Sequence, residues 1–268
     1  MRVVELLDDW PVEALEPLLP WLDTALLCRP DGFPLGGLTE RVAQWAVPVQ
    51  PRYPTASWLQ RLAAGESVPQ ARLTRTLTLE PFDWRGQPRW TQAQWRRILA
   101  APELEGVAEL TVPSTLRGPW LEIACSEARL GGVRVVFAER LFPRGGERAD
   151  WLLQAPWMQR LDFLDLSESL DHSLAPLLDY PDLRIGHLML EECWISDDAM
   201  RAMLHWPPLL HMRCLNVRMS GVHPREIREA LETSPHLHAD LTLLGLDIDF
   251  PLPCVAHPDL LPAWEKAT

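Results

Sequence analysis

The chain has 268 residues, 47% of them hydrophobic, which is enough to bury a substantial core. Its formal net charge of -12 at pH 7 argues against a nucleic-acid-binding protein, because such binding depends mostly on Lys and Arg side chains that neutralise phosphates. We expect a reduced, cytoplasmic protein with no membrane segment, since the chain has no basic secretory leader, no long apolar run and no C-x-x-C pair among its five cysteines.

The first part of the chain, residues 1–72, predicts short helices and shows no repeat. Prolines interrupt its first apolar segment, and a proline inside a helix removes a donor and clashes with the preceding turn. A further helix is predicted near Thr55 to Ala64, where apolar residues share one face: Trp58, Leu59 and Leu62. We interpret residues 1–72 as a helical N-terminal cap, because the apolar end of a repeat array must be covered. An adaptor function for this region is the alternative.

From residue 73 onwards one unit recurs: a short strand, a turn, a helix, a proline and a leucine. The first positions of the strand patterns are separated by 24 to 33 residues and are Thr74, Val107, Val133, Leu161, Ile185, Met212 and His238. Each intervening helix carries apolar residues at positions i, i+3 and i+4, which predicts one buried stripe per helix. Thr91 with Gln94 is predicted to form a capping box, and Ser196 to cap the helix that follows it.

The fullest unit has apolar residues at the spacing L-x-x-L-x-L, followed by a cysteine and an isoleucine: Ile185, Leu188, Leu190, Cys193 and Ile195. This pattern resembles the leucine-rich repeat family, over about residues 73 to 250, with a unit length most similar to the ribonuclease-inhibitor-like class. The resemblance implies an α/β fold, a curved leucine-rich-repeat solenoid of about seven units. Its parallel sheet would lie on the concave side and its helices on the convex side. Residues 251–268 would form a C-terminal cap.

The resemblance also implies protein–protein recognition on the concave sheet. Outward residues of parallel strands about 4.8 Å apart line up in columns. One predicted column is Thr76, Glu109, Val135, Phe163, His187, Cys214 and Asp240, and the next is Thr78, Thr111, Phe137, Asp165, Met189, Asn216 and Thr242. Several tryptophans at turns between elements are predicted to pack rather than bind: Trp157, Trp194 and Trp206.

Apolar side chains within an acidic rim are typical of a binding patch. The candidate partner-binding residues are Phe137, Glu139, Phe163, Asp165, Glu168, His187, Met189, Glu191 and Glu192. Their charge predicts a basic protein partner. The alternative is that these acidic residues only keep the sheet face solvated.

An enzyme or a metal protein is the rival class, because His187, Cys214 and Asp240 share one predicted column. A thiolate beside an imidazole can act as a nucleophile, and the three residues together could bind a metal. The order of these residues across the strands argues against a catalytic relay, because Cys214 lies between His187 and Asp240. The chain has no Gly-rich phosphate loop, no G-x-S-x-G and no H-E-x-x-H. We therefore predict a non-enzymatic binding module without cofactor or metal.

Overall fold

The structure is a computed structural model, and it describes residues 55–68, 71, 76–83, 85–138, 149–168, 174–237 and 240–246. The predictions for the first helices, for Glu139 and for the C-terminal cap therefore lie outside the described residues. Within the described part of the chain, no helix is both long enough and apolar enough to cross a bilayer.

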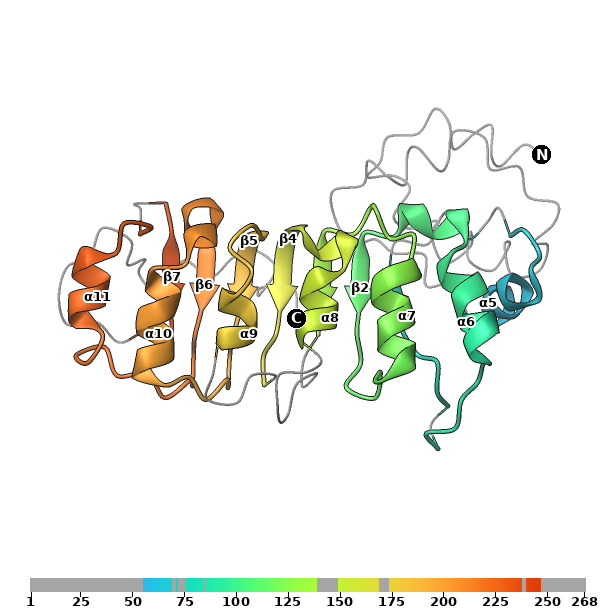
Figure 1. Cartoon of the computed structure of the whole chain (residues 1–268), viewed down its shortest axis with the longest axis horizontal. Coiled ribbons are helices and arrows are strands. Elements are labelled where there is room, and N and C mark those ends of the chain that lie inside the picture. Colours follow the sequence, from blue (N-terminus) through green and yellow to red (C-terminus); the bar gives the residue numbers. More distant parts are fainter. Residues whose placement is uncertain are drawn as a thin grey trace, which may run out of the picture.

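The described residues form an α/β repeat structure around a seven-stranded parallel sheet, in which the strands follow one another in chain order (Figure 1). The strands are β1 (Thr76–Thr78), β2 (Glu109–Thr111), β3 (Val135–Phe137), β4 (Arg160–Asp165), β5 (Arg184–Met189), β6 (Cys214–Asn216) and β7 (Thr242–Leu244). Parallel neighbours need a crossover between them, and here each crossover carries a short helix.

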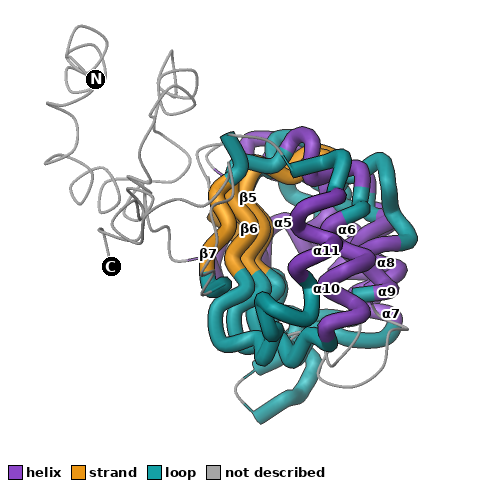
Figure 2. Tube along the Cα trace, turned by 90° about the vertical axis from the view of Figure 1, so that its left-hand side faces the viewer, coloured by secondary structure: helices purple, strands orange, loops and turns teal. Residues whose placement is uncertain are grey.

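The helices form a second layer on one face of the sheet, as the end view shows (Figure 2). The α-helices are α5 (Thr55–Ala64), α6 (Gln92–Leu99), α7 (Pro119–Glu127), α8 (Ala149–Gln154), α9 (Ala175–Leu178), α10 (Asp197–Leu204) and α11 (Arg228–Thr233). In the described part of the chain, 3₁₀ turns precede β2, β4 and β6: η3 (Pro102–Gly106), η5 (Pro156–Met158) and η6 (Pro207–His211). We call the sheet face turned away from the helices the distal face.

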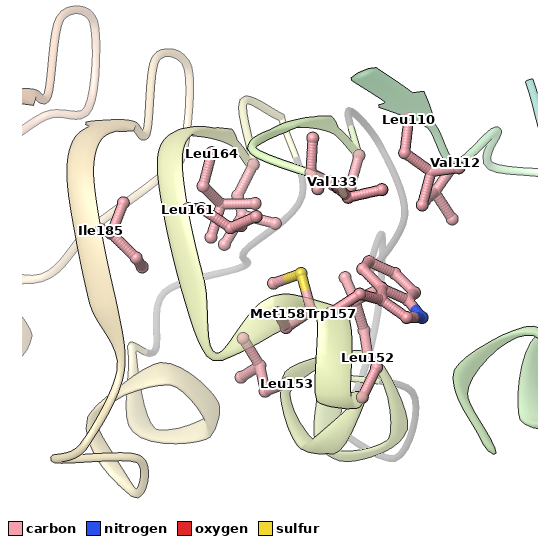
Figure 3. Close-up of a cluster of buried hydrophobic side chains, with 14 of the residues drawn as sticks. Leu110, Val112, Val133, Leu152, Leu153, Trp157, Met158, Leu161, Leu164 and Ile185 are labelled. Atoms are coloured by element: carbon pink, nitrogen blue, oxygen red, sulfur yellow. The ribbon is translucent and has the colours of Figure 1, made fainter. Parts of the chain in front are cut away.

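The core lies between these two layers. The next-to-last residue of every strand is buried and pairs in register with its equivalents on the neighbouring strands: Leu77, Leu110, Val136, Leu164, Leu188, Leu215 and Leu243. Burying one such side chain stabilises the fold by roughly 1.5–3 kcal/mol. Figure 3 shows the same packing around α8 and η5, where Leu153 and Met158 lie near Leu161 of β4.

The predicted helices and caps are confirmed where the structure describes them. α5 has the predicted bounds, and its Trp58 and Leu62 are buried in the common core. The backbone N–H of Gln94 donates to Thr91 Oγ1 (3.3 Å), and the backbone N–H of Thr91 donates to Gln94 Oε1 (2.8 Å). Ser196 caps α10 by accepting a hydrogen bond from the backbone N–H of Ala199.

A buried carboxylate fixes the segment after α5 to the repeats. Glu103 of η3 accepts hydrogen bonds at Oε1 from Ser67 Oγ (3.0 Å) and from the backbone N–H of Val68 (3.1 Å). A buried polar group must be satisfied in this way, because its desolvation would otherwise oppose folding. The pair of bonds therefore holds α5 on the end of the array.

The last strand departs from the sequence prediction by two residues. Thr242, and not Asp240, lies beside Cys214, and Leu244 lies beside Asn216. Both Leu241 and Leu243 are buried. A slip of two residues keeps every side chain on the same face of a strand, so the apolar pattern alone could not separate the two registers.

Gly186 provides a test of the close approach between β4 and β5. A methyl group at this position would lie 2.7 Å from the carbonyl oxygen of Asp162, whereas one at Gly131 would meet no atom within 4 Å. We expect Gly186→Ala to lower the free energy of unfolding by roughly 1–3 kcal/mol, the usual cost of overpacking.

Urea unfolding followed by circular dichroism measures this effect. Gly131→Ala is the matched control and should change stability by no more than about 0.5 kcal/mol. Equal stabilities for the two variants would contradict the close packing inferred at Gly186.

Candidate functional site

The distal face carries the predicted columns in register as far as β6. Phe163 lies beside Val135 on one side and His187 on the other, and His187 lies beside Cys214. In the next column Asp165 lies between Phe137 and Met189. The repeat spacing was therefore sufficient to predict which distal residues are neighbours across six strands.

The large apolar residues of these columns are less accessible than the sequence predicted. Phe163 is 9% exposed and Met189 is 5% exposed, so neither is an exposed anchor. Phe137 is half-buried, and its ring centroid lies 5.4 Å from that of Phe163. Periodicity shows which side chains share a face of the sheet but not how accessible each one is, so it could not predict this burial.

Four of the predicted acidic residues gather where β4 and β5 end. They are Asp165, Glu168, Glu191 and Glu192, which we call the acidic edge. The backbone N–H of Glu168 donates to the carbonyl of Glu191 (2.9 Å), so the two turns lie side by side. Glu192 is exposed, and the other three are half-buried. The acidic edge thus presents several carboxylates in a small area.

Asp165 also has a local structural function. Its Oδ1 accepts a hydrogen bond from the backbone N–H of Ser167 (2.9 Å). Asn216, at the equivalent position of β6, does the same for Arg218 (3.0 Å). This side-chain bond two residues along the chain stabilises a turn. Asp165 would therefore be needed here even without a partner.

Two exposed apolar side chains lie next to the acidic edge, and neither was predicted as a binding residue. Trp194 is 67% exposed and Met219 is 72% exposed. Their segments are joined by backbone hydrogen bonds from Glu192 to Arg218 (3.0 Å) and from Ile195 to Ser220 (2.9 Å). Trp157 and Trp206 are buried as predicted, so Trp194 is the exception among the turn tryptophans. Its place two residues after a turn glutamate was the available signal.

His187 is held in the neutral form on the distal face. Burial lowers the pKa of its imidazole below the usual 6.5, and the nearby Arg213 lowers it further. The backbone and the carboxylate of Asp162 oppose this shift. A neutral imidazole can accept a hydrogen bond from a partner near neutral pH.

The predicted grouping of His187, Cys214 and Asp240 does not form, because Thr242 takes the place beside Cys214. The described residues contain no cluster of three or more side chains suited to holding a metal ion. Cys214 is buried, as are Cys125 and Cys193. Burial raises the pKa of the Cys125 thiol to about 12, which keeps it protonated and unreactive at neutral pH.

The opposite edge of the sheet is basic, which the predicted columns did not indicate. Arginines occur where successive strands begin: Arg134, Arg160, Arg184 and Arg213. Arg160 and Arg184 are direct register partners on β4 and β5. The arginines recur at the repeat spacing in the sequence, but they precede the outward positions of the predicted columns.

These features describe a parallel-sheet repeat protein with oppositely charged sheet edges. No protein-family model matches the chain, and no curated protein matches it significantly.

The protonation of His187 gives a pH prediction. A lowered pKa in the folded state means that neutral His187 contributes stability above the unfolded pKa, and that this contribution is lost as the pH falls through the folded pKa. We expect the Cε1–H resonance of His187 to titrate below 6.5 in the folded protein and at the ordinary value in urea. A His187→Gln variant assigns the resonance. A folded-state midpoint at or above the urea value would contradict the burial argument.

Proposed function

We propose that the chain is a cytoplasmic leucine-rich-repeat protein that recognises another protein through its distal face and performs no chemistry. In this proposal residues 73–250 form the solenoid, and residues 1–72 and 251–268 form its caps. The partner presents a basic surface. The observation that carries the proposal is the acidic edge with exposed Trp194 and Met219 beside it.

The turn chemistry supports the family assignment. Cys193 occupies the position that the repeat pattern reserves for asparagine or cysteine. Its Sγ donates a hydrogen bond to the carbonyl oxygen of Leu166 in the preceding unit (3.2 Å), and the side chain is fully buried. The repeat pattern restricts this position to small residues with a hydrogen-bond donor, because the buried side chain pairs with a carbonyl of the previous turn. Seven parallel strands in chain order fit the same assignment.

The composition of the surface supports protein recognition. A binding patch combines apolar anchors, above all tryptophan, with a polar rim. Trp194 and Met219 provide exposed apolar area, and Glu192, which lies two residues before Trp194, provides charge. Phe137 and neutral His187 extend the same face towards β3. Two large exposed apolar side chains on hydrogen-bonded segments favour a binding patch over a merely solvated face.

Charge reversal at the acidic edge tests the electrostatic half of the proposal. We expect Glu191→Lys/Glu192→Lys to weaken binding of the partner by about tenfold or more, because like charges across an interface are unfavourable. The partner is first captured from the source cells and identified, and its dissociation constant is then measured by calorimetry. Asp165 is left unchanged because its carboxylate stabilises the turn.

The control for this experiment is Glu122→Lys/Glu229→Lys, which changes the net charge equally on the exposed surfaces of α7 and α11. It should change the dissociation constant by no more than about twofold. If both double variants bind the partner equally well, the acidic edge only solvates the sheet.

Truncation of Trp194 tests the apolar part of the proposed interface. We expect Trp194→Ala to weaken the same interaction by about thirtyfold, the effect of losing an aromatic hot spot. Leu210→Ala is the comparison, since Leu210 is also exposed but lies on η6, away from the acidic edge. Unchanged affinity in the Trp194 variant, with an unchanged urea midpoint, would exclude this tryptophan from the interface.

A further inference from the structure

A pocket of about 470 Å³ opens at the basic edge of the sheet, where β3 and β4 begin. It lies between the end of η3, the loop 128–134 and the segment 156–160. Three arginines line it: Arg129, Arg134 and Arg160. Glu105 is the single acidic residue among the lining residues. The pocket is therefore positively charged on a chain whose formal net charge is -12.

The three guanidinium groups differ in what already binds them. Arg134 Nη1 donates to the carbonyls of Val133 (2.8 Å) and Gly131 (3.4 Å), which orients the group and leaves its other N–H donors for a ligand. Arg129 Nη1 lies 3.7 Å from Glu105 Oε1, and both side chains are more than half exposed, so solvent weakens this ion pair.

Of the three arginines, Arg160 has the greatest unused capacity to bind an anion. It is exposed at the first position of β4, and it forms no ion pair within the part of the chain that the structure describes. Its backbone is fixed by the parallel pairing with Arg184. A ligand anion in the pocket would thus gain a charged partner without breaking an existing one.

The inner wall of the pocket is apolar and rigid. Leu130 and Trp157 are buried side chains of the common core. Trp157 Nε1 donates to the carbonyl of Ala124 (3.3 Å), so the indole is fixed and its donor points away from any ligand. Pro156 adds an exposed, inflexible ring beside them. An organic group could rest on this wall while its charged end meets the arginines.

We propose that this pocket binds a small phosphorylated organic molecule, with the phosphate group held by Arg129, Arg134 and Arg160. Guanidinium groups match phosphate oxygens through paired hydrogen bonds. The volume lies within the 300–1,000 Å³ typical of small-molecule sites and exceeds what a bare phosphate ion needs. The site lies at the opposite sheet edge from the acidic edge, so it is independent of the proposed protein partner.

Calorimetry on the full chain tests the site with three probes: adenosine monophosphate, inorganic phosphate and uncharged adenosine. Adenosine monophosphate should bind saturably at low ionic strength and adenosine should not, because the phosphate supplies the charge-assisted bonds. Inorganic phosphate should compete with it and bind more weakly, since it gains nothing from the apolar wall.

The matched variants are Arg160→Gln and Arg184→Gln, two exposed register partners of which only the first lines the pocket. Arg160→Gln should weaken binding of adenosine monophosphate by about tenfold, and Arg184→Gln by no more than about twofold. Urea midpoints of both variants verify that the fold persists.

Three results would overturn the proposal. The first is the absence of saturable binding of both anions up to about 10 mM, the weakest range of specific affinity. The second is an equal loss in the two arginine variants, which would show attraction by general surface charge. The third is phosphate binding as tight as that of adenosine monophosphate, which would exclude a contribution from the organic part.

Discussion

The structure depends on one constraint, which is that the next-to-last residue of each strand must pack beside its equivalents on the neighbouring strands and beneath the helices. Leu110, Val136, Leu164 and Leu188 are completely buried in this row. Because the row fixes the register, it also fixes which side chains become neighbours on the distal face. The columns that contain Phe163, His187 and Asp165 are consequences of how the leucines pack.

The same constraint explains the charges of the two sheet edges. In a parallel sheet every strand begins at one edge and ends at the other, so a residue type that recurs at one repeat position collects along one edge. Arginines at the strand starts therefore form the basic edge, and carboxylates after the strand ends form the acidic edge. Antiparallel strands would have mixed the two sets. A chain of this topology can carry a site for an anion and a surface for a basic protein without conflict.

The sequence was sufficient for features that depend on periodicity and insufficient for features that depend on size or on loops. The helix stripes, the helix N-caps at Thr91 and Ser196 and the register through β6 follow from sequence pattern alone. Spacing could not detect the slip that places Thr242 beside Cys214, because Leu241 and Leu243 satisfy either register. It could not show that Phe163 and Met189 are buried. Spacing could not predict the arginine pocket either, because the walls of the pocket come from loops of successive units.

The turns after β4, β5 and β6 share a backbone conformation that bears on the proposed recognition surface. Glu168, Glu192 and Met219 each have a φ angle of 55°, in the left-handed region that glycine or asparagine adopts at lower cost. A non-glycine residue there costs on the order of 1 kcal/mol, and the chain accepts this cost at three successive turns. Two of the three side chains are glutamates of the acidic edge, and the third is the most exposed of the large apolar side chains that the structure describes. Glycine would have stabilised each turn better, so the retained side chains support a function for this surface beyond folding.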